Sequence, residues 1–365
     1  MANFTLTVPN KNGSYDGDYV VKQYTSLTIS AGNVLTTDQP CKGLLIYVTG
    51  NCTIAGTLSM RGRGPASNPD TYLGANGIRY PVLVSGATGT LAAAEFSGAG
   101  SAVAAAVANQ FPASGNGRII QIPKRGSSGG AAVGVNGTSG SGTGTTGTAG
   151  SASLSSNTYT VTLGGGGAGG YYIDTNSCGG QSTCFSTRGG NATAFSGGTG
   201  GGGKMSGTNS ASASSPGDDN GGAGGNSSNG HCGGVHTVTG GVGNPGGIDR
   251  YGSTGQGGNN QNAATATSGT GGVVWLIVGG NLTIEGTGII DVRGTDQITT
   301  GRTEGGVYGA GGASGGGAAI ILYRGTLTNS GSILTGGGAG FSGGGVNAGP
   351  GGTGGAGSSI IQQIL

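Results

Sequence analysis

The sequence predicts an all-β protein: a β-solenoid or sandwich of short repeated strands joined to a packed bundle of glycine-rich, left-handed extended helices of the polyglycine II type. Two observations support this fold class. Glycine supplies 92 of 365 residues, while 8% are charged and 5% aromatic. Apolar β-branched runs with shared turn glycines also recur toward both ends of the chain. Because a helical or α/β enzyme of this length would carry far more Leu, Glu and Lys, a conventional apolar core cannot organise the whole molecule.

The repeated β unit is clearest where 44–64 is aligned without a gap to 274–294. Six positions then agree, placing Gly50, Asn51, Thr53, Ile54, Gly56 and Thr57 on Gly280, Asn281, Thr283, Ile284, Gly286 and Thr287. A third copy at 319–338 keeps two glycines at the same six-residue spacing, and a degenerate copy at 24–37 differs by about one residue. Recurring short strands separated by tight Gly-Asn turns predict stacked coils or hairpins.

Two apolar runs within these units, 44–48 and 273–278, contain no alternating polar residues. Strands that lie buried on both faces have this continuous apolar pattern. We therefore expect both runs to lie at the centre of the molecule.

The glycine-rich stretches have a period of three. From Gly240 to Gly258, six of the seven positions taken in steps of three are glycine, and a similar frame runs from Gly337 to Gly355. This period fits neither an α-helix nor a strand, but it fits the left-handed extended helix, which has no internal hydrogen bonds. Backbone groups must then pair with neighbouring segments, which approach closely only where no Cβ intervenes. A flexible Gly/Ser linker is the alternative, but the phased frames favour a packed lattice.

The sequence suggests three regions. Residues 1–125 form a β-rich attachment module with a short Ala-rich helix at 101–110, which ends at Phe111-Pro112. Residues 126–270 form the glycine-rich region, with non-glycine inserts. Residues 271–365 contain β repeats that merge into a C-terminal lattice.

Charge and cysteine content exclude several functions. Net charge is +2 with scattered Lys and Arg, so nucleic acid is not an expected partner. The N-terminus lacks a basic region and an apolar core, so a secretory signal is not expected, and no apolar run is long enough to span a bilayer. Five cysteines leave at least one unpaired; Cys178 and Cys184 could close a small loop, and the sequence leaves this open.

No catalytic residue, metal site or cofactor is expected. The neighbouring carboxylates Asp218 and Asp219 lie in glycine and asparagine company, which is typical of turns, and nothing fixes the separation of Asp291 from Asp296. The stretch "HCGGVH" at 231–236 offers three ligands without the companion pair that a structural zinc site needs. The protein is therefore predicted not to be an enzyme.

Aromatic and charged residues in the inserts are the candidates for recognition, because such side chains on a rigid scaffold give large contact areas. The alternative is that they form small cores under the loops. The candidates are Tyr171, Tyr172, Asp174, Phe185, Arg188, Arg250 and Tyr251.

The stretch 17–64, followed by glycine blocks interrupted by variable inserts, resembles the glycine-rich tail-fibre and adhesin proteins of bacteriophages. The resemblance is compositional and architectural. In such adhesins, polyglycine helices form a sandwich and the intervening loops contact host receptors. It implies a virion protein, extracellular after lysis, that binds a surface glycan or outer-membrane protein. Phage fibres are commonly trimers, so a homotrimer is one assembly that it implies.

The N-terminal segment alternates Phe4, Leu6 and Val8, which predicts a strand that docks onto another virion protein. Two other functions remain open. One is a purely structural fibre or capsid decoration protein. The other is ice binding, because 143–150 is rich in threonine. Ice binding needs a flat, regular face, however, and the inserts make the surface irregular.

Overall fold

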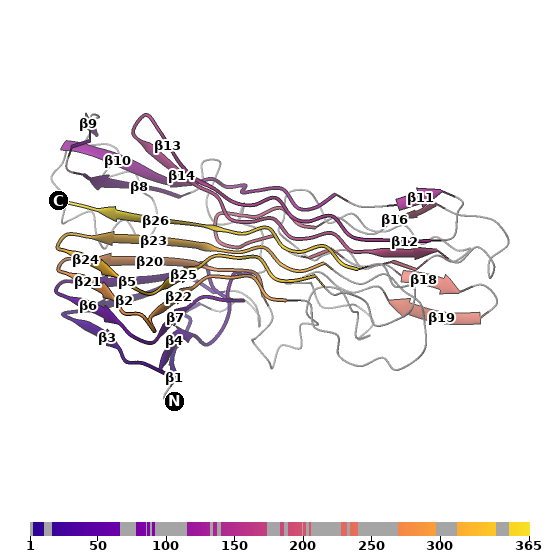
Figure 1. Ribbon diagram of the computed structural model, residues 1–365, viewed down its shortest axis with the longest axis horizontal. Helices are drawn as coiled ribbons and strands as arrows, with labels where there is room; N and C mark the ends of the chain where they lie inside the picture. The colour runs from indigo at the N-terminus through magenta and orange to yellow at the C-terminus, as the bar shows by residue number, and fades with distance from the viewer. Residues whose placement is uncertain are drawn as a thin grey trace.

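The computed structural model describes residues 3–10, 17–65, 78–84, 86–87, 90–91, 115–131, 134–136, 140–173, 183–185, 189–198, 200–201, 204–205, 228–231, 234–239, 269–296, 312–340 and 350–365. This part of the chain is all-β and contains no helix. The Ala-rich helix predicted at 101–110 lies outside it. The molecule is elongated, with stacked strands at one end and short, separate strands at the other (Figure 1).

Three parallel sheets make up the stacked end. Sheet 1 has the order β2 (Val20–Tyr24), β5 (Leu44–Val48), β20 (Val273–Val278), β23 (Ala318–Tyr323), β26 (Ser358–Gln363). Sheet 2 has the order β3 (Leu27–Ile29), β6 (Cys52–Ile54), β21 (Leu282–Ile284), β24 (Leu327–Asn329). Sheet 3 has the order β1 (Asn3–Leu6), β4 (Val34–Thr37), β7 (Thr57–Ser59), β22 (Ile289–Asp291), β25 (Ser332–Leu334). The chain passes through sheets 1, 2 and 3 in that order, again and again.

The strand register confirms the first half of the sequence alignment and corrects the second. Leu44 lies opposite Val274, as the gapless match predicts. Thr57, however, lies opposite Ile289 and not opposite Thr287. The third pass has two extra residues in its turn, so Gly288 replaces Gly286 as the counterpart of Gly56. A Cβ on Gly286 would meet nothing, whereas one on Gly288 would lie against the carbonyl oxygen of Ile54.

An asparagine ladder explains the recurring Gly-Asn pair. Asn51 Oδ1 accepts a hydrogen bond from the backbone N–H of Asn281 at 2.9 Å. Asn281 Oδ1 in turn accepts one from the backbone N–H of Thr326 at 2.8 Å. A Cβ on Gly280 would lie 2.5 Å from Asn51 Oδ1, so each asparagine occupies the space that the glycine of the next pass leaves open.

Replacing Asn281 by alanine is expected to lower the free energy of unfolding by about 1 kcal/mol, because the N–H of Thr326 loses its partner. Denaturant titration measures the change. Thr328→Ala, on exposed β24, serves as the control and should change stability by less than about 0.5 kcal/mol. Equal stability of the two variants would contradict a stabilising role for the ladder.

The central strands of sheet 1, β5 and β20, are buried on both faces, which confirms the prediction from their apolar runs. Leu44, Ile46 and Val48 face the space enclosed by the three sheets. Leu45 and Trp275 belong to a second core on the opposite face. All six residues of β20 are buried.

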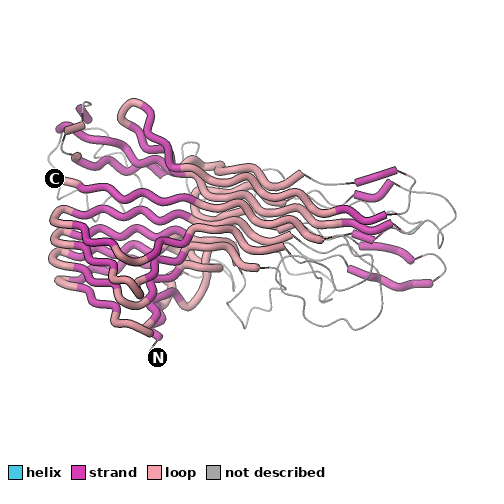
Figure 2. Tube along the Cα trace, in the orientation of Figure 1, coloured by secondary structure: helices cyan, strands magenta, loops and turns pink. Residues whose placement is uncertain are grey.

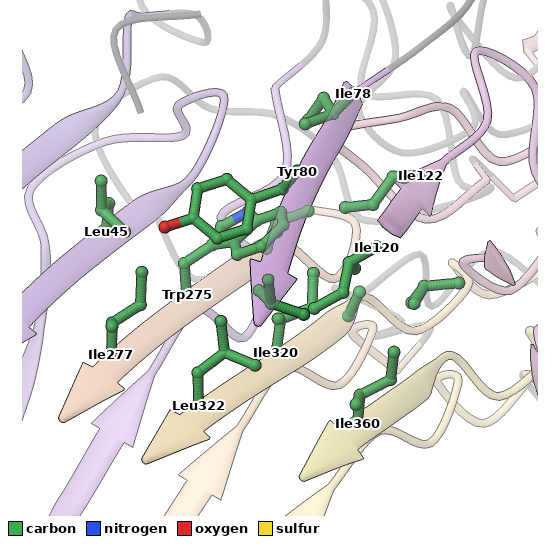
Figure 3. Packing of buried hydrophobic residues seen from close by; sticks show 14 of the residues in the cluster. Leu45, Ile78, Tyr80, Ile120, Ile122, Trp275, Ile277, Ile320, Leu322 and Ile360 are labelled. Carbon is green, nitrogen blue, oxygen red and sulfur yellow. The ribbon is translucent and has the colours of Figure 1, made fainter. Parts of the chain in front are cut away.

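The second core is covered by a fourth sheet. Its order is β13 (Ala152–Ser155), β14 (Thr158–Val161), β10 (Gly115–Ile122), β8 (Ile78–Leu83), with β9 (Thr90–Leu91) also paired to β10. The rings of Tyr80 and Trp275 pack with their centroids 5.2 Å apart. Figure 3 shows Ile120 of this sheet pointing toward Ile320 of sheet 1. Sheets 1 and 4 thus form a two-layer apolar sandwich.

Glycine-rich segments continue directly from the strands of this sandwich and run side by side away from it (Figure 2). We call this region the glycine lattice. Its segments are 126–131, 144–150, 163–168, 189–192, 196–198 with 200–201, 312–317, 335–340 and 350–357.

Segment 163–168 shows the hydrogen-bond pattern of the lattice. Gly164 and Gly167 donate to Gly316 and Ala313 of one neighbour; Gly165 and Ala168 donate to Thr148 and Thr145 of a second; and Gly166 donates to Gly190 of a third. The same segment accepts bonds from Ser127 and Gly130, from Gly198 and Gly201, and from Gly352 and Gly355. Hydrogen bonds to any one neighbouring segment recur every three residues, so successive N–H groups along the segment point to different neighbours.

The close approach of these segments requires glycine. A Cβ on Gly164 would lie on the carbonyl oxygen of Gly355, and a Cβ on Gly167 on that of Gly352. These obstacles are backbone atoms of packed neighbours, so they cannot rotate away as a flexible side chain can. In the sandwich, side chains hold the layers apart. In the lattice these side chains are absent, so the same layers lie closer together.

Candidate functional site

The lattice ends in a group of short strands at the far end of the molecule (Figure 1). They are β11 (Gly134–Asn136), β12 (Gly140–Gly142), β15 (Tyr171–Ile173), β16 (Thr183–Phe185), β17 (Lys204–Met205), β18 (Ser228–His231) and β19 (Gly234–Thr239). They pair in small sheets: β11 with β16, β15 between β12 and β17, and β18 with β19. We call this group the distal strands.

The insert predicted to carry recognition residues, 171–188, contributes β15 and β16 to the distal strands. Tyr171 and Tyr172 open β15, directly after lattice segment 163–168 and two further glycines. Phe185 closes β16, opposite Gly134 of β11. Strand pairing therefore holds the backbone of the insert at Tyr171–Ile173 and at Thr183–Phe185, and the lattice sets where it begins.

Four of the predicted recognition residues cannot be placed. Asp174, Arg188, Arg250 and Tyr251 lie outside the described residues. Their role stays a prediction.

Lys204 is a neighbour that the sequence analysis missed. Parallel pairing of β15 with β17 puts Tyr171 beside Lys204 and Tyr172 beside Met205, about thirty residues further along the chain. On the other side, β12 offers Gly142 and Ser141 opposite the two tyrosines. The signal in the sequence was the interruption of a glycine run by "KM" at 204–205.

The N-terminal docking candidates lie at the other end of the molecule, on the edge of sheet 3. β1 pairs with β4 of the same chain, with Phe4 opposite Leu35. The Phe4 side chain is 57% exposed, Leu6 packs against the enclosed core, and Val8 is buried. Phe4 is thus the member of the three that is accessible to a partner, while Val8 is committed to the protein's own core.

The carboxylates considered for catalysis have structural partners where they are described. Asp291 accepts from Arg293 Nε at 2.9 Å and from Nη2 at 2.7 Å. Asp296 accepts from Arg61 Nη2 at 3.1 Å and from the backbone N–H of Ala339 at 2.7 Å. Both carboxylates lie where sheet 3 meets the lattice. Asp218 and Asp219 are outside the described residues.

The three residues considered as metal ligands are only partly placed. His231 lies in β18 and His236 in β19, which pair with each other. Cys232 lies outside the described residues. Among the residues that the structure places, no group of three His, Cys, Asp or Glu could hold a metal ion. In the same part of the chain, no helix is long and apolar enough to cross a membrane.

Two cysteines, Cys41 and Cys52, are free and buried. Burial raises the pKa of the Cys41 thiol to about 11 and that of Cys52 to about 12. Cys184 lies in β16, and Cys178 is outside the described residues, so a bond between them stays untested.

Cys41 and Cys52 are therefore expected to resist iodoacetamide at about pH 8, because the thiolate is the reacting form and both sulfurs are inaccessible. Peptide mass mapping after alkylation of native protein measures this, and alkylation in denaturant supplies the positive control. Rapid labelling of either thiol in the native protein would contradict the packing of the enclosed core.

No protein-family model, curated protein or solved structure matches this chain.

Proposed function

We propose that this protein is a non-enzymatic bacteriophage virion protein that projects from the particle and binds a host-cell receptor through its distal strands and the loops between them. The observation that carries the proposal is the lattice itself, which holds the tyrosine-bearing insert at the far end of the molecule from the stacked sheets (Figure 1). The resemblance of 17–64 and the glycine blocks to phage adhesins supports the same function.

The proposal includes a finer description of the fold. Sheets 1 to 3 form the faces of a β-solenoid, since the chain passes through them in a fixed order with parallel register. The lattice segments are polyglycine II helices, a description supported by hydrogen-bond partners that recur every three residues. Such a bundle is stiff without a large apolar core, which suits a projecting virion component.

The expected receptor is a bacterial surface glycan or an outer-membrane protein. Tyr171, Tyr172 and Phe185 provide aromatic groups in paired distal strands, and aromatic residues dominate the energetics of recognition surfaces. The opposite end, where Phe4 is exposed, is the expected attachment to other virion proteins.

Immunogold labelling or cryo-EM of intact particles, with and without host cells, tests the proposal. Label at a distal tip that touches the cell is the expected result. Label spread over the capsid or along a shaft would make the protein a structural fibre or decoration component and would overturn receptor binding. Absence from purified particles would overturn the virion assignment altogether.

A further inference from the structure

Three adjoining lattice segments lead into one three-stranded sheet at the far end of the molecule. Segment 163–168 precedes β15, segment 196–198 with 200–201 precedes β17, and segment 144–150 follows β12. In that sheet β15 lies between β12 and β17. The strands are therefore extensions of segments that the lattice already holds side by side (Figure 2).

The lattice also sets the register of this sheet. Ala168 donates its N–H to the carbonyl of Thr145 in the antiparallel neighbouring segment. Three residues further along, Tyr171 lies opposite Gly142, so the register of the lattice continues unchanged into the strands. On the other side, Tyr171 is paired with Lys204 of β17. Backbone pairing on both sides thus places Tyr171, independently of the loop that follows it.

The two faces of this sheet differ in composition. Residues alternate between the faces along each strand, and residues paired across strands share a face. One face has the row Gly142, Tyr171 and Lys204. The other face has the row Ser141, Tyr172 and Met205. Only the first row, which we call the Tyr171 row, sets a residue without a side chain, an aromatic residue and a cationic residue side by side.

Lys204 is the only Lys, Arg, Asp or Glu in the distal strands that the structure describes. No carboxylate therefore occupies a paired position in these strands, and strand pairing does not neutralise the lysine. A lysine on an edge strand also prevents pairing with another chain. That role needs no particular neighbour, whereas a binding role depends on the tyrosine beside it.

We propose that the Tyr171 row binds an acidic residue of a bacterial surface polysaccharide, whose sugar ring lies on the tyrosine and whose carboxylate or phosphate pairs with the lysine. Neighbouring strands are about 4.8 Å apart, which places the ring and the charge within reach of a single sugar residue. Gly142 on the other side leaves room for the next sugar of the chain. The inference rests on the proposed receptor-binding function and narrows its receptor to an anionic glycan.

A polysaccharide suits so small a site better than a protein does. A stable protein interface buries about 800 Å² on each partner, whereas the row crosses only three short strands. A polysaccharide repeats its acidic residue, so several weak sites on one particle act together. Single-stranded nucleic acid also offers rings and phosphates, but the net charge is +2 and the Lys and Arg residues are scattered rather than clustered.

The test is an array of bacterial polysaccharides that contain uronic acid or phosphate, each printed beside its carboxyl-reduced or dephosphorylated form and probed with the full-length protein. We expect the acidic forms to bind at least about tenfold more strongly than their neutral forms, and the binding to weaken as salt rises. Loss on carboxyl reduction identifies a carboxylate, and loss on dephosphorylation identifies a phosphate. Equal binding of neutral forms, no binding of any acidic form, or stronger binding of single-stranded poly(dT) on the same array would overturn the proposal.

Four variants locate the site. Lys204→Gln should weaken binding about tenfold because it removes the charge, and Lys204→Arg should bind within about threefold of the original protein. Tyr171→Ala should also weaken binding about tenfold. Tyr172→Ala is the matched control, since it removes the adjacent tyrosine from the opposite face, and should bind within about twofold. Unchanged binding by Lys204→Gln, or a larger loss for Tyr172→Ala than for Tyr171→Ala, would overturn the assignment.

Particle adsorption separates this inference from the function on which it rests. If Lys204→Gln particles adsorb normally and protease treatment of the host cells abolishes adsorption, the receptor is an outer-membrane protein. Receptor binding then stands, and the acidic polysaccharide is wrong. If particles without the protein adsorb normally, the receptor-binding function is wrong, and the array alone decides whether the Tyr171 row binds acidic polysaccharide.

Discussion

Gly165→Ala is expected to destabilise the protein by about 3 kcal/mol or more, because the new Cβ would lie on the carbonyl group of Ser128 in a neighbouring lattice segment. The same residue donates its N–H to Thr148 and accepts at its carbonyl from Gly355. Pushing the segments apart would therefore strain bonds on two further sides. Chemical denaturation followed by intrinsic fluorescence measures the loss.

Gly286→Ala is the matched control. A Cβ at Gly286 would meet nothing within 4 Å, and its backbone does not adopt the left-handed conformation that disfavours side chains. This variant should unfold within about 0.5 kcal/mol of the original protein. Similar stability of both alanine variants would show that the lattice tolerates side chains, and the tight packing at Gly165 would then be wrong.

Replacing 174–182 with a Gly/Ser linker of equal length is expected to reduce host adsorption at least about thirtyfold, since it removes the centre of the insert while leaving β15 and β16 in place. The rate at which free particles disappear from a host culture measures adsorption. This prediction rests on the proposed receptor-binding function.

The control for the insert is an identical nine-residue replacement at 66–74, between the strands of the stacked end. Particles carrying it should assemble in normal numbers and adsorb normally. If the 174–182 replacement also adsorbs normally, with normal particle yield, residues 174–182 do not bind the receptor.

The β architecture could be predicted because its signals are local. Apolar runs at 44–48 and 273–278 indicate doubly buried strands without any knowledge of their partners, and the shared Gly-Asn pair places them in register. The two-residue insertion at Gly286 and Thr287 was missed because a second glycine and threonine happened to preserve the apparent match. Only the position of the neighbouring backbone distinguishes Gly286 from Gly288.

The candidate site was less accessible to sequence reasoning, because it depends on pairing between distant segments. Nothing near Tyr171 in the sequence indicates Lys204, which reaches it through the parallel pairing of β15 with β17.

The register of sheet 1 also determines when the molecule can fold during synthesis. β5 pairs with β2 close by in the chain, but its other neighbour, β20, is translated about 230 residues later. Lattice segment 163–168 likewise waits for 312–317 and 350–357 before its backbone groups are paired. Contacts between segments so far apart in the sequence form slowly, because the entropy cost of closing the intervening loop must be overcome first. The nascent chain must therefore carry an apolar strand with one unpaired edge, and a glycine segment with only part of its backbone paired within the protein, until nearly all of these residues have left the ribosome.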